Sequence, residues 1–190
     1  VSGAKTPDPA ASHGGTAQLN ADILLPVNEV FMQLADEWLA QARMSKFAVL
    51  AIDINFFKLY NEIYGRKAGN LMLERVAAVS ARAVERLGGV AGYMGGDNFC
   101  MMFPTDGIST AELERDLTTR IRQHHFPPGF SLVCGVCESD DRSTPALSLY
   151  DRALVALANV KGSYTQHVSF YDASKYKRQR DMQVMLIGAQ

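Results

Sequence analysis

Long apolar runs, a disulfide framework and a basic surface are all missing from this sequence. None of its hydrophobic stretches approaches the roughly 20 residues that a membrane-spanning helix needs. Its 3 cysteines, an odd number in a chain of 190 residues, do not suggest a disulfide scaffold. The formal net charge of −1 lacks the basic excess that nucleic-acid-binding proteins usually carry. We therefore expect no membrane segment in this sequence and no nucleic-acid partner.

The composition suits one domain with a hydrophobic core, because 47% of the residues are hydrophobic and 21% are charged. Residues 1–20 are rich in Pro, Gly, Ala and Ser, which is typical of a flexible linker or a tag. We expect the domain to span residues 21–172 and a connecting helix to span residues 173–190. The chain starts at Val1 without a signal-peptide pattern, so we interpret it as part of a longer protein.

Apolar spacing predicts an alternation of strands and helices along the domain. The expected elements are a helix from Leu24, a strand at 46–53, a short helical turn, a long helix ending near Gly88, a hairpin at 89–103, a helix after Ser109, a strand at 130–136, a helix from Thr144-Pro145 to a cap at Gly162 and an edge strand at 167–171. This order favours an α+β, ferredoxin-like fold. We expect a mainly antiparallel five-stranded sheet flanked by helices, with the helices packed on one face.

The segment CGVC (134–137) has a spacing found in redox and zinc sites. It lies in the expected strand at 130–136, where side chains alternate between faces, so the two cysteines should point to opposite sides. No second CxxC or HxxxH segment supplies further zinc ligands. His124 and His125 lie at a helix end, and we interpret them as surface residues.

Two acids should meet at one rim of this sheet. Asp53 ends the first strand at its exposed end, and Asp97 lies in the turn of the hairpin, after Gly95 and Gly96. In the expected topology the first strand is next to this hairpin, so the two carboxylates converge. Oxygen ligands with an open side suit Mg²⁺ that carries a nucleotide phosphate, and the glycines let a ligand approach the backbone closely.

The residues after Asp53 add groups that could hold a phosphate. Lys58 should lie at the start of a helix, and the main-chain amides of residues 55–57, which include Phe56 and Phe57, should point at the same ligand. The alternative is that Asp97 only occupies a tight turn, where Asp and Gly are common.

The segment AIDINFFKLYNEIYGRKAGNLMLERVA (51–77), followed by YMGGDNF (93–99), resembles the GGDEF family of diguanylate cyclases. The resemblance extends over about residues 22–172. It implies a nucleotidyl-cyclase palm that binds one GTP, and a homodimer in which each 3′-hydroxyl attacks the partner's α-phosphate to give cyclic di-GMP.

The resemblance also assigns residues to roles. It implies metal ligation by Asp53, Asp97 and the carbonyl of Ile54, with Asp97 also catalytic, a phosphate contact by Lys58 and a guanine contact by Asn61. Two carboxylates and one carbonyl fill only half of an octahedron, so we expect Mg²⁺ only together with nucleotide.

Several positions depart from the family pattern. Asn98 stands where the signature has Glu, and Asn55 replaces the second Asp of D-x-D. Asn70 stands where the family has a carboxylate that accepts from guanine. An amide turns a donor toward a donor there, which should weaken guanine binding by roughly 1–3 kcal/mol.

Further departures lie elsewhere around the implied pocket. Tyr93 replaces an Arg, while Ala158 and Gly162 stand where the family has a phosphate-binding Lys and Arg, with Lys161 close enough to substitute. We therefore expect Gly95, Gly96, Phe56, Phe57, Lys58, Asn61 and Asn70 to form a weakened nucleotide site.

The family's feedback site also departs from its pattern. In RLGG (86–89) Arg86 is present but Gly89 replaces the Asp of R-x-x-D. We expect no inhibitory cyclic di-GMP site of the usual kind.

Three functions remain open: a degenerate regulatory module that binds GTP weakly or not at all, a slow diguanylate cyclase, and a structural dimerisation domain. The number of departures favours the first. In this family a trailing helix such as 173–190 often leads into an EAL-type phosphodiesterase domain, and we expect a cytoplasmic location, within a larger and membrane-associated signalling protein if the parent chain carries an anchor.

Overall fold

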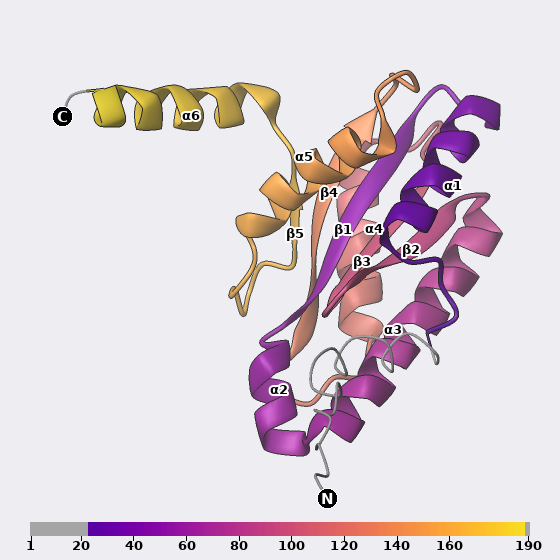
Figure 1. Cartoon of the computed structure of the whole chain (residues 1–190), viewed down its shortest axis with the longest axis vertical. Coiled ribbons are helices and arrows are strands. Elements are labelled where there is room, and N and C mark those ends of the chain that lie inside the picture. The colour runs from indigo at the N-terminus through magenta and orange to yellow at the C-terminus, as the bar shows by residue number, and fades with distance from the viewer. Residues whose placement is uncertain (1–22, 189–190) are drawn as a thin grey trace, which may run out of the picture.

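The computed structural model describes residues 23–188, so the expected linker at 1–20 lies outside the described residues. A five-stranded sheet with the strand order β2-β3-β1-β4-β5 forms the centre of the domain (Figure 1). The pairs β2–β3, β3–β1 and β1–β4 are antiparallel, and β4–β5 is parallel. The elements are α1 (Asn28–Gln41), β1 (Phe47–Asn55), α2 (Phe57–Tyr64), α3 (Arg66–Leu87), β2 (Val90–Gly95), β3 (Asn98–Pro104), α4 (Thr110–Gln123), β4 (Ser131–Ser139), α5 (Ala146–Ala158), β5 (Val168–Phe170) and α6 (Ala173–Gly188). The expected α+β, mainly antiparallel architecture is confirmed.

Helices cover both faces of this sheet, so the expectation of helices on one face is wrong. Figure 1 shows α1 and α5 in front of the sheet and α3 and α4 behind it. All nine residues of β1 are buried, because Leu50 and Ile52 belong to the core under α3 and α4, whereas Val49 and Ala51 belong to the core under α1 and α5. An unbroken apolar run is the pattern of a strand that is covered on both sides.

Strand alternation separates the two cysteines of CGVC. Cys134 belongs to the core beneath α3 and α4, and Cys137 to the core beneath α1 and α5. Both are buried free thiols, and burial raises the pKa of each. The prediction that they point to opposite sides is confirmed.

Local sequence signals account for the start of α4 and the end of α3. Ser109 and Glu112 form the reciprocal capping box that starts α4, and Gly88 ends α3 in a left-handed conformation. The expected cap at Gly162 is wrong, since α5 ends at Ala158 and Asn159 is its C-cap. Gly162, at φ +84°, lies in the turn that follows, and this turn approaches the end of β1.

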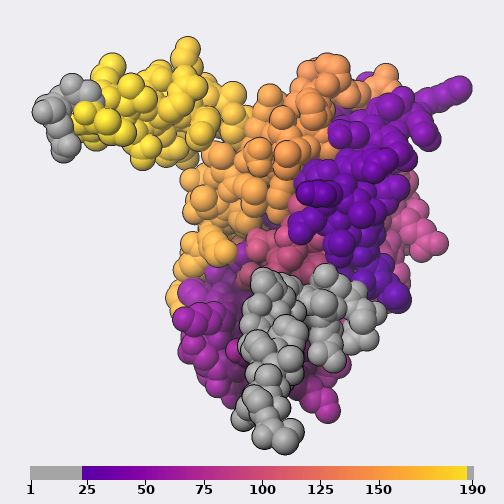
Figure 2. All heavy atoms as spheres, viewed as in Figure 1, coloured from indigo at the N-terminus to yellow at the C-terminus, as the bar shows by residue number. Residues whose placement is uncertain are grey.

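The last helix, α6, projects away from the rest of the domain (Figures 1 and 2). Its side chains at Met182, Val184, Met185, Leu186 and Ile187 are largely exposed. Within residues 23–188, no helix combines the length and the apolar character needed to cross a bilayer.

Candidate functional site

The hairpin turn between β2 and β3 is shaped by its two glycines. Gly95 and Gly96 have φ values of +93° and +60°, a region that glycine adopts without strain. The hydroxyl of Tyr93 donates to the carbonyl oxygen of Gly96 at 2.7 Å and ties the turn to the strand. This turn presents Asp97 at the end of the sheet where β3 begins and β1 finishes, which we call the acidic edge. The sequence showed Tyr93 only as a departure from a family pattern, and gave no signal for this hydrogen bond.

The structure brings Asp53 and Asp97 together. Asp53 on β1 is the cross-strand partner of Asn98 on β3, which places the preceding residue beside it. Burial raises the pKa of both carboxyls, and the neighbouring negative charge of Asp97 raises that of Asp53 further. The expectation of an exposed strand end is wrong, because β1 continues to Asn55 and the Asp53 side chain is 0% exposed.

A lysine covers the buried carboxylate of Asp53. The Nζ atom of Lys161 lies 2.6 Å from Asp53 Oδ2, and the Lys161 side chain is 56% exposed. Burial lowers the pKa of Lys161, but the hydrogen bond and charge of Asp53 outweigh it and leave the pKa raised. The sequence suggested Lys161 as a substitute phosphate contact. In the structure it supplies a positive charge directly to an implied metal ligand.

The turn that carries Lys161 is held by Asn55. The side-chain oxygen of Asn55 accepts from the amide of Gly162 at 2.9 Å, and its amide nitrogen donates to the carbonyl of Ser163 at 2.8 Å. An aspartate could make only the first of these bonds, since an ionised carboxylate has no donor. The ring of Tyr164 stacks on Phe56 with centroids 4.8 Å apart. We define residues 160–164 as the covering turn.

Sequence reasoning missed the contacts of the covering turn, because Asp53 and Asn55 are 108 residues away from the turn residues that they bind. A signal was present in the amide at Asn55, which replaces a family acid, but nothing in the sequence identified Ser163 or Tyr164 as its neighbours.

The implied nucleotide contacts surround the start of α2 and α3. Lys58 and Asn70 are exposed, while Asn61 is partly buried. The Asn61 Oδ1 atom is buried without a hydrogen-bond donor among the described residues. A Cβ atom on Gly69 would lie 1.8 Å from this oxygen, so α3 approaches α2 closely only because residue 69 is glycine. The guanine contact that the family resemblance implies for Asn61 stays a prediction.

The start of α2 has an unusual backbone. Phe56 is its N-cap residue and adopts the left-handed region at φ +62°, which is uncommon for a bulky side chain. Phe57 opens the helix, and its ring lies parallel to that of Tyr60 with centroids 6.5 Å apart. The phosphate role expected for these amides is not tested by the structure.

Asn98 is turned toward its own hairpin. Its Nδ2 atom donates to the carbonyl of Gly95 at 3.4 Å, a long hydrogen bond. An amide in this position adds no negative charge beside Asp53 and Asp97. Ala158, at the end of α5, is exposed and offers no group to a phosphate.

The acids at this edge supply some, but not all, of the ligands that a metal ion needs. Asp53 Oδ1 is buried and receives no hydrogen bond from the described residues, and the Asp97 carboxylate lies beside it. Within residues 23–188, no three His, Cys, Asp or Glu side chains converge as metal-ligand sets do. The role of Asp53, Asp97 and the Ile54 carbonyl as Mg²⁺ ligands, which the family resemblance implies, stays a prediction.

Comparisons with known proteins bear on the family and the fold. The family model described as "Diguanylate cyclase, GGDEF domain" matches residues 28–167. The GGDEF domain of DgcB from Caulobacter crescentus, solved in complex with c-di-GMP, superposes with a TM-score of 0.66 at 19% identity, covering 88% of this chain and 100% of that one. The GGDEF domain of PA1120 from Pseudomonas aeruginosa gives a TM-score of 0.63 at 23% identity, covering 79% and 98%. Identities this low show the fold alone.

Two curated relatives align over shorter stretches. Diguanylate cyclase DgcP of Escherichia coli is 29% identical over 131 residues, which are 65% of this chain and 38% of that protein. Diguanylate cyclase A of Treponema denticola is 38% identical over 64 residues, 34% of this chain and 17% of that protein. The chain thus spans well under half the length of either relative. Because the family model covers most of the chain and the sheet has the same architecture, the chain belongs to the GGDEF family of diguanylate cyclase domains.

Proposed function

We propose that this chain is a degenerate GGDEF domain that acts as a regulatory module of cyclic di-GMP signalling in the cytoplasm. The observation that carries the proposal is the ion pair between Lys161 and Asp53. It neutralises the buried carboxylate that the family resemblance assigns to the metal. A domain that satisfies this charge internally has less need of Mg²⁺ and therefore less affinity for a metal-bound triphosphate.

The residues around the pair support weak GTP binding without efficient turnover. Bound with a triphosphate, Mg²⁺ would be held by Asp53, Asp97 and the Ile54 carbonyl, and would supply Lewis-acid activation of the phosphate. Asn98 contributes no charge to this edge, and its amide is engaged with the hairpin. Asn70 presents an amide where a carboxylate would accept from guanine. Each change removes an interaction that aligns the 3′-hydroxyl with a partner's α-phosphate.

A slow diguanylate cyclase is the second candidate. It is favoured by the convergence of Asp53 and Asp97 and by the exposure of Lys161, whose side chain reaches the pair from a surface turn and is free to leave it. Synthesis would need two copies of the domain face to face. The exposed apolar side chains of α6 suit contact with a second copy or with a further domain, such as one of the EAL type.

The experiment is calorimetry with GTP and Mg²⁺ alongside a product assay for cyclic di-GMP. Binding without product supports the regulatory module, and product formation at a measurable rate supports the cyclase. Absence of both would refute nucleotide binding and leave a structural role.

Repair variants separate a single lesion from general decay of the pocket. We expect Asn98→Glu alone to leave synthesis undetectable, and the triple variant with Asn70→Asp and Ala158→Lys to be needed, because guanine and phosphate contacts act at opposite ends of the same GTP. Restoration by Asn98→Glu alone would show that the rest of the pocket is competent. Strong synthesis by the unmodified domain would overturn the degenerate assignment.

A further inference from the structure

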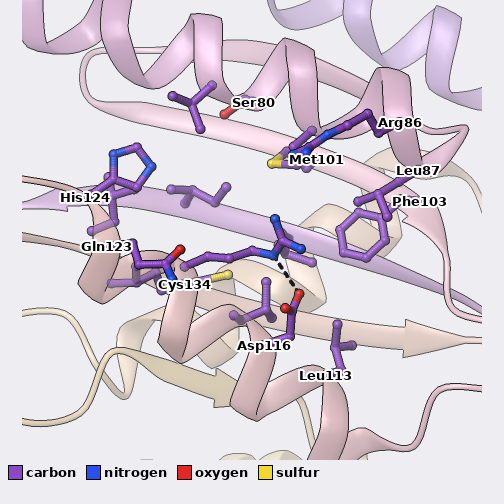
Figure 3. Close-up of a pocket in the computed structure, with 18 of the residues that line it drawn as sticks. Ser80, Arg86, Leu87, Met101, Phe103, Leu113, Asp116, Gln123, His124 and Cys134 are labelled. Carbon is purple, nitrogen blue, oxygen red and sulfur yellow. Dashed lines mark hydrogen bonds and ion pairs between the residues drawn. The ribbon is translucent and has the colours of Figure 1, made fainter.

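A cavity of about 830 Å³ lies between α3 and α4, on the face of the sheet opposite α1 and α5. Figure 3 shows the helix with Ser80 and Arg86 facing the helix with Leu113 and Asp116, and Met101 of the sheet between them. The gap arises because α3 packs on β2 and β3, whereas α4 contacts β4 and β5. Its volume lies within the roughly 300–1,000 Å³ of small-molecule sites.

The cavity is separate from the edge that carries the two acids. Among the described residues, Asp53, Asp97 and Lys161 are not part of its lining. A ligand here would therefore bind whether or not the domain retains a nucleotide site.

The floor and walls of the cavity are mainly aliphatic. They include Leu50 and Met101 from the sheet, Val79 and Ala83 from α3, and Leu113 and Leu117 from α4. An apolar lining of this kind favours a hydrocarbon chain, because such a ligand loses contact with water without leaving polar groups unpaired.

The two ends of the cavity differ in charge. Toward the end of α3, Arg86 shares the rim with Glu112, which closes the capping box of α4. Along α4, Asp116 is paired with Arg120 at 2.7 Å. At this side of the cavity each acid therefore already has a partner, Ser109 for Glu112 and Arg120 for Asp116.

The opposite end carries positive charge without an acid in the lining. Arg75 lies there with His124 and His125. Arg75 is exposed and forms no ion pair with another residue of the described chain. Burial and the nearby charge of Arg75 both lower the pKa of His124.

We propose that this cavity binds a long-chain carboxylate, with the acyl chain between α3 and α4 and the carboxylate at Arg75. The aliphatic lining selects the chain, and the guanidinium selects an anionic head group through charge-assisted hydrogen bonds. The site goes beyond the function proposed above and does not depend on it. Such a ligand would bridge α3 and α4, the two helices that the gap separates.

Calorimetry with dodecanoate tests the proposal, with octanoate and decanoate as a length series. Each added methylene should tighten binding roughly three- to fourfold if the chain enters the apolar gap. Ala83→Trp should abolish binding by filling the cavity, whereas Ala78→Trp, at an exposed position of α3 outside the lining, should not. Val79→Phe is the second filling variant if Ala83→Trp fails to fold, as judged by circular dichroism.

Arg75→Ala should weaken dodecanoate binding roughly tenfold to a hundredfold, in line with the loss of a charged hydrogen bond. Arg82→Ala, also exposed on α3 but outside the lining, is the matched control. Dodecyltrimethylammonium should bind more weakly than dodecanoate. No binding of dodecanoate, equal binding of the cationic amphiphile, or displacement of dodecanoate by cyclic di-GMP at micromolar concentration would overturn the assignment.

Discussion

Replacing Lys161 by Met tests whether this lysine takes the place of a metal ion at the acidic edge. The substitution keeps an aliphatic side chain but removes the charge that lies 2.6 Å from Asp53 Oδ2. Asp53 would then be a buried carboxylate next to Asp97 with no cation. We expect a less stable domain that gains affinity for Mg²⁺.

The size of the effect follows from the burial of the two partners. Exposed ion pairs contribute about 0–1 kcal/mol, whereas removing one partner of a fully buried pair costs about 3–5 kcal/mol. Here the Asp53 side chain is 0% exposed and that of Lys161 is 56% exposed. The loss should therefore lie between these limits, at about 1–3 kcal/mol, which corresponds to about 2–4 °C in Tm for each kcal/mol in a domain of this size.

The decisive measurement is the dependence of thermal unfolding on Mg²⁺ at a fixed concentration of GTP, because the two acids and the Ile54 carbonyl would fill only half of the Mg²⁺ shell. If Lys161→Met opens a site with Kd near ~1 mM, then ~10 mM Mg²⁺ should restore about 1.4 kcal/mol to the variant, and it should add much less to the unmodified domain. Lys161→Arg keeps the charge and should behave like the unmodified domain. Lys175→Met removes an exposed lysine of α6 and controls for net charge. Equal stabilisation by Mg²⁺ with and without Lys161 would refute the reasoning.

Three further changes test the packing and the electrostatics of the same region. Gly135→Ala should destabilise the domain by at least about 1–3 kcal/mol in urea unfolding, because the new Cβ would lie 2.0 Å from a backbone oxygen of α5; an unchanged unfolding midpoint would contradict this close approach. Asn55→Asp should cost about 1–3 kcal/mol and speed hydrogen exchange in the covering turn, since the carbonyl of Ser163 loses its donor; the same change at the exposed Asn159 should have little effect. The raised pKa of Asp97 means that the folded state binds its proton more tightly than the unfolded state, so its contribution to stability is largest at low pH and is lost as pH rises through the folded-state value. Asp97→Asn should therefore raise the free energy of unfolding at neutral pH relative to acidic pH. If the pH profile of stability runs parallel to that of the unmodified domain, the pKa of Asp97 is not raised by folding.

The order and type of the elements could be predicted because each depends on local signals. The capping box at Ser109 and Glu112, the glycine that ends α3 and the alternation of Cys134 and Cys137 across β4 are properties of short segments, and the structure has all of them. The convergence of Asp53 with Asp97 was also predictable, because a hairpin strand paired with β1 fixes the register. The family motif added weight to the same conclusion, since its residues lie on these strands.

Other predictions were wrong, or missed a feature, because the feature depends on packing between distant segments. Covering both faces of the sheet requires α1 and α5 to pack against the second side of β1, and an apolar run alone does not say which helix covers which side. The cavity between α3 and α4 results from the positions at which the two helices pack on the sheet. The spacing between those positions cannot be read from hydrophobic periodicity.

The sequence by itself determined the fold, the family and the edge at which the acids meet, because hydrophobic pattern, turn residues and motif spacing act over short stretches of chain. Only the tertiary structure decided what lies on that edge. The covering turn reaches Asp53 and Asn55 from more than 100 residues away, and the ion pair of Lys161 exists because burial leaves the carboxylate of Asp53 in need of a nearby positive charge. Sequence spacing suggested Lys161 as a substitute phosphate contact. In the folded domain the same lysine is instead the cation that pairs with Asp53.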